Sequence, residues 1–330
     1  MNNQASSFQY DRIFTGLPGR FGPEAQAVFR LQYEQNELYR QFVRLVSKDP
    51  KSRAAPEQFP FLPISFFKTH SIRTGAFVPE IIFESSGTTG QTVSRHEVKS
   101  VALYRESFIR GFELFYGPVS DYCILGLLPA YLERSGSSLV FMVDELIRQS
   151  RHPQSGFYLN EFDRLHALLL DLEERKQKTL LIGVSFALLD FAEAFPVELK
   201  STLIMETGGM KGRREEITRA GLHEILCQAF GQKEIHSEYG MTELLSQAYS
   251  TGNGIYRPVP WMKAMIRKED DPMDVQSTGE GLLNIIDLAN RDSCSFIATD
   301  DLAKLYADGS FEVLGRLDNS DLRGCSLLTV

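Results

Sequence analysis

Residues 84–90 read Glu84-Ser85-Ser86-Gly87-Thr88-Thr89-Gly90 and separate two segments of different character. Before them, Phe77 to Phe83 is an apolar run typical of a β-strand, and after them comes the pattern of a long amphipathic helix. The stretch itself offers consecutive backbone N–H groups and four hydroxyls, which together can bind phosphate oxygens without a fixed cation. It is not a Walker-type loop, because Gln91 and Thr92 follow its last glycine. The alternative is a plain polar turn between two elements.

Around this stretch, apolar runs alternate with helical patterns from residue 77 to residue 230. Helices are predicted at Pro23–Val46, Val98–Phe115, Ser137–Arg148, Glu161–Arg175, Ser185–Ala194 and Glu215–Phe230, and buried strands at Tyr122–Leu128, Leu180–Val184 and Leu203–Met205. This alternation is typical of an α/β fold with a mostly parallel sheet flanked by helices. Binding sites in such sheets lie at the carboxyl ends of strands, where both Gly-rich segments, 85–90 and 206–212, begin.

The pattern changes after about residue 250. Short strands are predicted at 264–267, 282–287, 295–298 and 311–314, and Asp308-Gly309 is a hairpin turn signal. We therefore predict two parts, an α/β body with a helical N-terminal segment at 1–250 and a β-rich subdomain that ends in a short tail at 251–330.

Composition limits the classes of partner and compartment. The net charge of −8 over 330 residues argues against an electrostatic grip on nucleic acid or on an anionic membrane. No run approaches the ~20 apolar residues of a membrane span, and the polar start, Met1 to Tyr10, does not have the pattern of a secretory signal. The four cysteines form no CxxC pair and have no metal-site spacing, so free thiols in the cytoplasm are expected.

Four polar segments together offer what an ATP site needs. Ser85, Ser86, Gly87, Thr88, Thr89 and Gly90 would bind phosphate. Gly208 and Gly209 would let adenine lie on bare backbone, with Tyr239 on its other side. Asp301 would accept hydrogen bonds from ribose hydroxyls, and Glu243 would bind Mg²⁺, which keeps several waters and needs few carboxylates. His236 is a weaker site candidate, and His96 is expected to be structural.

These motifs, in this order, resemble those of a known enzyme superfamily. The loop 85–90, the run Tyr239-Gly240-Met241-Thr242-Glu243, Thr299-Asp300-Asp301 and Gly315-Arg316-Leu317-Asp318 resemble the core motifs of adenylate-forming (ANL) enzymes. That resemblance implies ATP and Mg²⁺, and it implies ATP contacts for Gly240, Thr242 and Arg316 as well. The usual Thr-Gly-Asp of the superfamily is Thr299-Asp300-Asp301 here, so Asp301 takes the ribose role by position.

A narrower resemblance is to the acyl-protein synthetase (LuxE) family, related to the phenylacetate-CoA ligases. It rests on Leu62 to Lys68, Glu84 to Gly90, Thr207 to Arg213 and Asp318 to Cys325, and it covers roughly residues 25 to 326. In that family a fatty acid is activated by ATP, and a cysteine near the C-terminus takes the acyl group as a thioester and passes it on. The resemblance therefore implies that Cys325 accepts the acyl group.

The resemblance also implies a fold without the small C-terminal lid domain of full-length ANL enzymes, which carries a lysine used in adenylation. Lys68, Lys211 and Arg316 are the candidates for the cation that replaces it. The expected function is ATP-dependent activation of a carboxylic acid, with transfer through Cys325 to a partner such as a reductase or a carrier protein. A ligase that loads coenzyme A or a carrier protein directly, and a nucleotide-binding subunit without turnover, are the alternatives.

Overall fold

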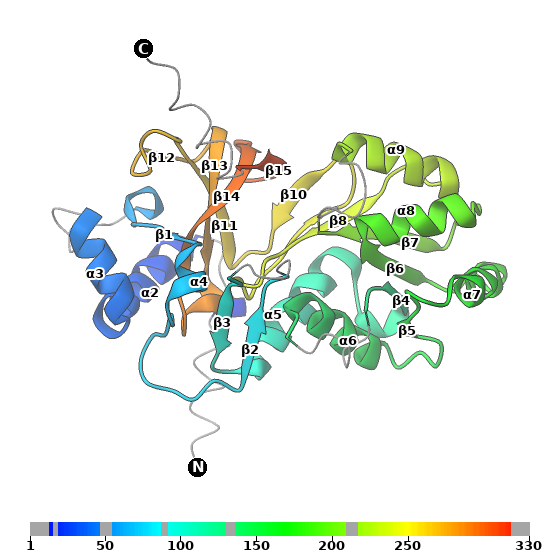
Figure 1. Ribbon diagram of the computed structural model, residues 1–330, viewed down its shortest axis with the longest axis horizontal. Helices are drawn as coiled ribbons and strands as arrows, with labels where there is room; N and C mark the ends of the chain where they lie inside the picture. The colour runs from blue at the N-terminus through cyan, green and yellow to red at the C-terminus, as the bar shows by residue number, and fades with distance from the viewer. Residues whose placement is uncertain are drawn as a thin grey trace.

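The computed structural model describes residues 13–15, 19–46, 55–86, 92–129, 136–208 and 217–317 (Figure 1). Its helices there are α2 (Phe21–Gln35), α3 (Glu37–Val46), α4 (Phe66–Thr69), α5 (Val101–Tyr116), α6 (Ser138–Ser150), α7 (Phe162–Glu174), α8 (Ser185–Ala194) and α9 (Arg219–Phe230). Its strands are β1 (Leu62–Pro63), β2 (Ile81–Glu84), β3 (Arg95–Val98), β4 (Cys123–Leu127), β5 (Gly156–Phe157), β6 (Thr179–Val184), β7 (Thr202–Thr207), β8 (His236–Tyr239), β9 (Ala248–Ser250), β10 (Ile255–Pro258), β11 (Met262–Arg267), β12 (Val275–Gln276), β13 (Gly279–Asp287), β14 (Phe296–Leu305) and β15 (Phe311–Arg316). Among these residues no helix combines the length and the apolar character that crossing a membrane requires.

One large sheet organises the described chain, in the order β12-β11-β13-β14-β15-β10-β9-β8-β7-β6-β4-β5, with β1 added beside β14. In this order, β5, β4, β6, β7 and β8 run parallel to one another. From β8 through β9, β10, β15, β14, β13 and β11 to β12, each strand is antiparallel to its neighbour. The predicted α/β class with helices flanking a parallel sheet is confirmed for the first group. The strands on either side of residue 250, β9 and β10, pair directly, with Tyr249 opposite Arg257, so the sheet is continuous there. The predicted division into two parts at residue 250 stays a prediction.

The parallel strands β4, β6 and β7 are almost wholly buried because both of their faces are covered (Figure 1), and their central residues are mainly apolar. Ile124, Leu180 and Met205 belong to the core that includes α5 and α6. Their neighbours along the chain, Leu125, Leu181 and Ile204, belong to the second core, with α7, α8 and α9. Alternate residues of each strand thus face opposite cores. We call these the α5 face and the α9 face of the sheet.

The predicted helix over 23–46 is wrong as a single element, because the chain breaks at Asn36 between α2 and α3. Asn36 has φ −105° and ψ 103°, and its side-chain oxygen accepts a hydrogen bond from the Tyr39 amide at 2.9 Å. Its side-chain nitrogen donates to the Ser293 carbonyl at 3.1 Å. Asn36 therefore begins α3 and ties the helix pair to the chain that follows β13.

Replacing Asn36 with alanine is expected to lower the free energy of unfolding by about 1–3 kcal/mol, because it removes a cap and a buried hydrogen bond together. Urea denaturation measures the change. Gln41→Ala, which removes an exposed amide that bonds only Glu37 among the described residues, is the matched control and should change stability by less than about 0.5 kcal/mol. Equal losses in the two variants would contradict this account of the break.

The loop at 85–90 does not lead into a helix as predicted. It belongs to the connection between β2 and β3, which pair antiparallel with Glu84 opposite Arg95, and α5 begins only at Val101. The connection closes through the Ser85 amide, which donates to the Ser94 carbonyl at 3.0 Å, and through Ser85 Oγ, which accepts from the Ser94 amide at 2.9 Å. Ser85 and Ser94 therefore close a hairpin, and the described chain after residue 91 continues into β3 and not into a helix.

Candidate active site

Three predicted site residues that are far apart in sequence lie together at the carboxyl end of β8. Tyr239, the last residue of β8, donates its hydroxyl proton to Asp301 Oδ2 at 2.8 Å. Arg316 Nε lies 3.8 Å from the other carboxylate oxygen, because Arg316 and Asp301 are paired across β14 and β15. Burial raises the pKa of Asp301, while the Tyr239 hydrogen bond and the Arg316 charge act against that rise. The carboxylate thus accepts hydrogen bonds at the end of a parallel strand.

The motif Thr299-Asp300-Asp301 forms an irregular part of β14. Leu302 pairs with Leu282 and Ala298 pairs with Asn284, so the three motif residues oppose the single residue Leu283. Thr299 Oγ1 donates to the Leu283 carbonyl at 2.8 Å and also accepts from the Asp301 amide at 3.2 Å. Such a bulge redirects a side chain out of the regular alternation. Here it supports Asp301 beside Tyr239.

Glu243 is a buried carboxyl close to these residues. Its side chain is 6% exposed. Burial raises the pKa of Glu243, while a hydrogen bond from Ser94 and the positive charges of Arg316 and Lys68 lower it. Ser94 closes the hairpin that carries the loop 85–90, so Glu243 lies between that hairpin and the strand that carries Arg316.

The backbone before Glu243 is held by His96 and Asn290, which the sequence did not mark as site residues. His96 Nδ1 lies 2.8 Å from the Thr242 carbonyl, and Nε2 lies 3.0 Å from Asn290 Oδ1. Asn290 in turn donates to the Glu243 carbonyl at 2.7 Å. Burial lowers the pKa of His96 to about 4, against the two hydrogen-bond acceptors that its ring nitrogens face. The predicted structural role of His96 agrees with these contacts.

Lys68 reaches this region from the other side of the hairpin. Leu62 and Pro63 pair in parallel with Ile297 and Ala298 of β14, and the next residues form the one-turn helix α4. The Phe67 ring packs edge-on against His96 with centroids 5.7 Å apart, so α4 lies against β3. Lys68 is exposed on α4, and its charge acts on Glu243.

The strand β7 ends at Thr207, and Gly208 follows it with φ +72°, a conformation that favours glycine. Among the described residues, no atom would lie within 4 Å of a Cβ atom at Gly208. Glu206, one residue inside β7, receives Arg219 Nε at 3.2 Å, and Arg219 also donates to the Val313 carbonyl of β15 at 3.0 Å. Arg219 therefore links α9 to the two halves of the sheet.

Other predicted residues are less informative. Ser86 is exposed at the base of the loop, and Thr242 is half-buried. His236 packs against the Tyr116 ring, 5.6 Å between centroids, and is not with Asp301 and Glu243. Gly87, Thr88, Thr89, Gly90, Gly209, Lys211 and Cys325 lie outside the described residues.

The donor set at Glu243 fits Mg²⁺. The described residues contain no group of three or more His, Cys, Asp and Glu that could bind a metal. A single carboxylate with water and phosphate oxygens is the usual environment of Mg²⁺ in nucleotide sites. Glu243 is such a carboxylate, and within the described chain no cation lies within ion-pair distance of it.

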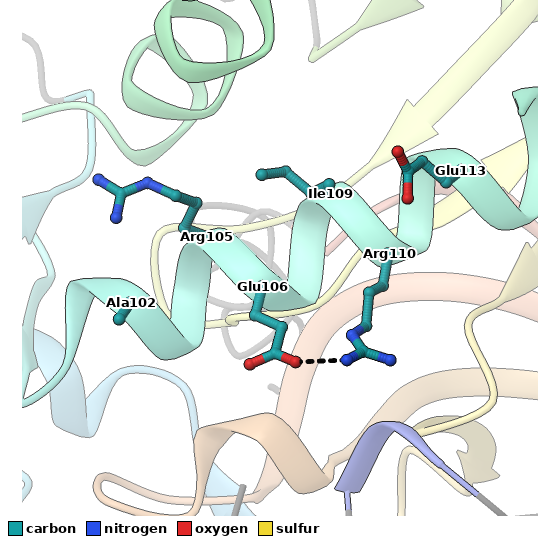
Figure 2. A pocket seen from close by; sticks show the side chains of 6 residues that line it. All are labelled: Ala102, Arg105, Glu106, Ile109, Arg110 and Glu113. Carbon is teal, nitrogen blue, oxygen red and sulfur yellow. Dashed lines mark ion pairs between the residues drawn. The ribbon is translucent and has the colours of Figure 1, made fainter. Parts of the chain in front are cut away.

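A separate surface depression of about 520 Å³ lies over α5 and is not part of this site (Figure 2). Its lining residues are Ala102, Arg105, Glu106, Ile109, Arg110 and Glu113. Arg110 pairs with Glu106 at 2.7 Å, and Arg105 pairs with Glu145 of α6 at 2.7 Å. This is the outer face of α5, because Phe108 and Phe112 on the other side of the helix are buried.

Comparison with known proteins gives the fold a context. No protein-family model and no curated protein matches the sequence. Among solved structures, ATP-bound MatB from Rhodopseudomonas palustris matches with a TM-score of 0.54 and 16% identity, over 73% of this chain and 49% of that one. The amide bond synthetase McbA from Marinactinospora thermotolerans matches with a TM-score of 0.51 and 17% identity, over 83% and 54%. This chain therefore shares a fold with these proteins and spans about half of their length.

Proposed function

We propose that this protein uses ATP and Mg²⁺ to activate a carboxylic acid, a fatty acid by the LuxE resemblance, as its acyl-adenylate. The observation that carries the proposal is the convergence of four motif residues, namely Tyr239, Glu243, Asp301 and Arg316, from three separate segments. The fold shared with ATP-bound MatB supports the same reading. A plain structural cluster would not require the order of motifs that the sequence shows.

Each residue has a role in this reaction. The Asp301 carboxylate accepts hydrogen bonds from the ribose, and Arg316, which lies beside it, supplies positive charge. The substrate carboxylate attacks the α-phosphorus, pyrophosphate leaves, and the negative charge that spreads over the phosphate oxygens is stabilised by Arg316 and Lys68. Glu243 would bind Mg²⁺, which when bound neutralises charge on the phosphates. His96 and Asn290 keep the backbone that carries Glu243 in place.

The second step transfers the acyl group to a thiol. We propose an acyl-protein synthetase of LuxE type, in which the Cys325 thiolate attacks the carbonyl carbon of the mixed anhydride, AMP leaves, and a thioester forms. A partner protein then receives the acyl group. Lys211 is the other cation proposed for the first step, and it, like Cys325, lies outside the described residues.

Replacing Cys325 with serine is expected to abolish the covalent acyl adduct and to leave acid-dependent exchange of pyrophosphate into ATP within about twofold, because exchange needs only the first step. Intact-protein mass spectrometry after incubation with ATP, Mg²⁺ and a panel of acids measures the adduct. Cys227→Ser, which removes a half-buried thiol on α9, is the matched control and should keep the adduct.

Two outcomes favour other functions. If the wild type forms no adduct and acylates free coenzyme A or a carrier-protein thiol as fast as Cys325→Ser does, the chain is a direct ligase. If no acid supports pyrophosphate exchange in the wild type while ATP still binds, the chain is a nucleotide-binding subunit without turnover.

A further inference from the structure

A cluster of buried polar side chains lies on the α5 face of the sheet, where β8 and β9 pair. Glu238 of β8 is opposite Tyr249 of β9, and residues paired in this way project from the same face. Met205 of the α5 core pairs with His236, two residues before Glu238, which places Glu238 on that face. Tyr239 projects from the opposite face. The cluster and the candidate ribose site thus lie on different sides of one strand end.

The three members of the cluster are Glu238, Gln247 and Tyr249. Glu238 is 7%, Gln247 4% and Tyr249 1% exposed. Gln247 Oε1 and the Tyr249 hydroxyl are fully buried, and neither has a hydrogen-bond partner among the residues that the structure describes. One Glu238 oxygen, Oε2, accepts from Thr207 Oγ1, and within the described chain the other, Oε1, has no such donor.

Gly240 lies next to two of these side chains. A Cβ atom at Gly240 would collide with Glu238 Oε1 and would lie 3.5 Å from Gln247 Cγ, so both side chains lie over the same small stretch of backbone. The Tyr249 ring packs on the Phe115 ring of α5, with centroids 5.1 Å apart, and its edge approaches Gly111, where a Cβ atom would be 3.8 Å from Tyr249 Cε2. Folded proteins rarely bury unpaired polar atoms, and the two on Gln247 and Tyr249, two positions apart in the chain and next to the Glu238 carboxyl, indicate an absent hydrogen-bonding group.

The chemistry of the three groups limits what that group is. Gln247 Oε1 only accepts hydrogen bonds, so the ligand must bring a donor. The Tyr249 hydroxyl both donates and accepts. Burial raises the pKa of Glu238 to about 7, so near neutral pH its carboxyl is often protonated and can donate as well. A hydroxyl group fits this set without adding a buried charge, whereas an ammonium group would need Glu238 ionised and both charges removed from water.

We propose that Glu238, Gln247 and Tyr249 form a subsite for a hydroxyl group of the acid substrate, so that the protein selects a hydroxylated acid over the same acid without the hydroxyl. This inference rests on the proposed acid-activating function. The subsite adjoins Gly240 in the Tyr239–Glu243 motif and lies on the face of β8 opposite to Tyr239. A site that has hydrogen-bonding groups for a substrate hydroxyl rejects the analogue that lacks it, because its own polar groups then stay unpaired.

Calorimetric binding tests the subsite without requiring turnover. The probes are 2-, 3- and 4-hydroxyphenylacetate against phenylacetate, and 3-hydroxydecanoate against decanoate, each with and without ATP and Mg²⁺. We expect at least one hydroxylated acid to bind the wild type about 10- to 100-fold more tightly than its parent. Tyr249→Phe, which removes only the hydroxyl oxygen, should lose most of that preference and keep its affinity for the parent acid.

Tyr104→Phe is the matched control, because Tyr104 is a buried tyrosine of α5 whose hydroxyl is already bonded to the Ser138 carbonyl at 3.1 Å. It should keep the preference and melt at a lower temperature, while ligand-free Tyr249→Phe should melt no lower than the wild type. The inference is overturned if every hydroxylated acid binds no better than its parent, if 4-aminophenylacetate binds more tightly than all the hydroxylated acids, or if Tyr249→Phe keeps the full preference. Absence of pyrophosphate exchange with any acid, despite selective binding, would instead overturn the proposed function.

Discussion

Replacing Glu243 with glutamine is expected to reduce acid-dependent exchange of pyrophosphate into ATP at least about a hundredfold. The substitution keeps the size of the side chain and removes its charge. Glu243 is 6% exposed, and the positive charges of Arg316 and Lys68 act on it from neighbouring elements. A bound divalent cation would favour the ionised carboxyl against the burial that raises its pKa, and the neutral amide cannot give the same support.

The Mg²⁺ dependence separates this role from a general loss of structure. In Glu243→Gln the Mg²⁺ concentration for half-maximal exchange should rise at least about tenfold. The free energy of unfolding without Mg²⁺ should stay near the wild-type value, because the amide avoids burying a charge. Glu145→Gln is the matched control: Glu145 is also 6% exposed but pairs with Arg105, far from the motif residues in the fold. Unchanged exchange and Mg²⁺ dependence in Glu243→Gln would remove Glu243 from the metal site.

Three of the parallel strands, β4, β6 and β7, could be predicted from the sequence because burial on both faces leaves an apolar run, whereas the short β5 and the polar β8 were missed. Thr179–Val184 and Cys123–Leu127 are such runs, and the structure differs from the prediction there by a residue or so at the ends. The gathering of site residues at strand ends follows from the same parallel order, since the carboxyl ends of parallel strands meet at one edge. Tyr239 at the end of β8 and Gly208 just after β7 illustrate it.

The hairpin β2–β3 could not be predicted from the same signals. Its second strand reads Arg95-His96-Glu97-Val98, four residues with three polar side chains, and no apolar alternation marks it. His96 is buried only because its partners come from 146 and 194 residues further along the chain. A contact over that distance depends on tertiary packing, which local patterns do not report. The break at Asn36 was missed for a related reason: the apolar spacing continues across it, and only the buried partner Ser293 makes Asn36 a cap.

The cluster on the α5 face was missed because it depends on strand register. Glu238 and Tyr249 are eleven positions apart, and nothing in either residue type marks them as a pair until β8 and β9 are aligned. A shift of one residue would move Glu238 to the α9 face.

Glu238→Gln is expected to become more stable relative to the wild type, by about 3 kcal/mol, as the pH rises from ~4.5 to ~7.5. Burial, together with the nearby charge of Glu206, raises the pKa of Glu238 from 4.5 to about 7, against a hydrogen bond from Thr207. Between these values the folded wild type holds a proton that the unfolded chain has lost, so the wild-type free energy of unfolding falls as the pH rises. The amide does not titrate, so the variant lacks this loss.

Taking the difference between variant and wild type at each pH removes other groups that titrate in the same window. Burial raises the pKa of Asp287 to about 6, which lowers stability with rising pH, and lowers that of His96 to about 4, which acts in the opposite direction. Both groups are present in the variant and in the wild type, so their contributions cancel when the two sites are independent. Urea denaturation at a series of pH values therefore isolates the Glu238 contribution.

Glu97→Gln supplies a control of opposite sign. The Arg73 guanidinium holds the pKa of Glu97 below its usual value, so that carboxylate stabilises the wild type above the unfolded pKa and ceases to do so as the pH falls. The Glu97→Gln variant should accordingly lose stability relative to the wild type as the pH rises, with the change confined to acid pH. A flat difference for Glu238→Gln across ~4.5 to ~7.5 would mean that Glu238 is ionised in the folded protein at acid pH. The hydroxyl subsite would then have to bind its ligand through a buried carboxylate and not through a protonated carboxyl.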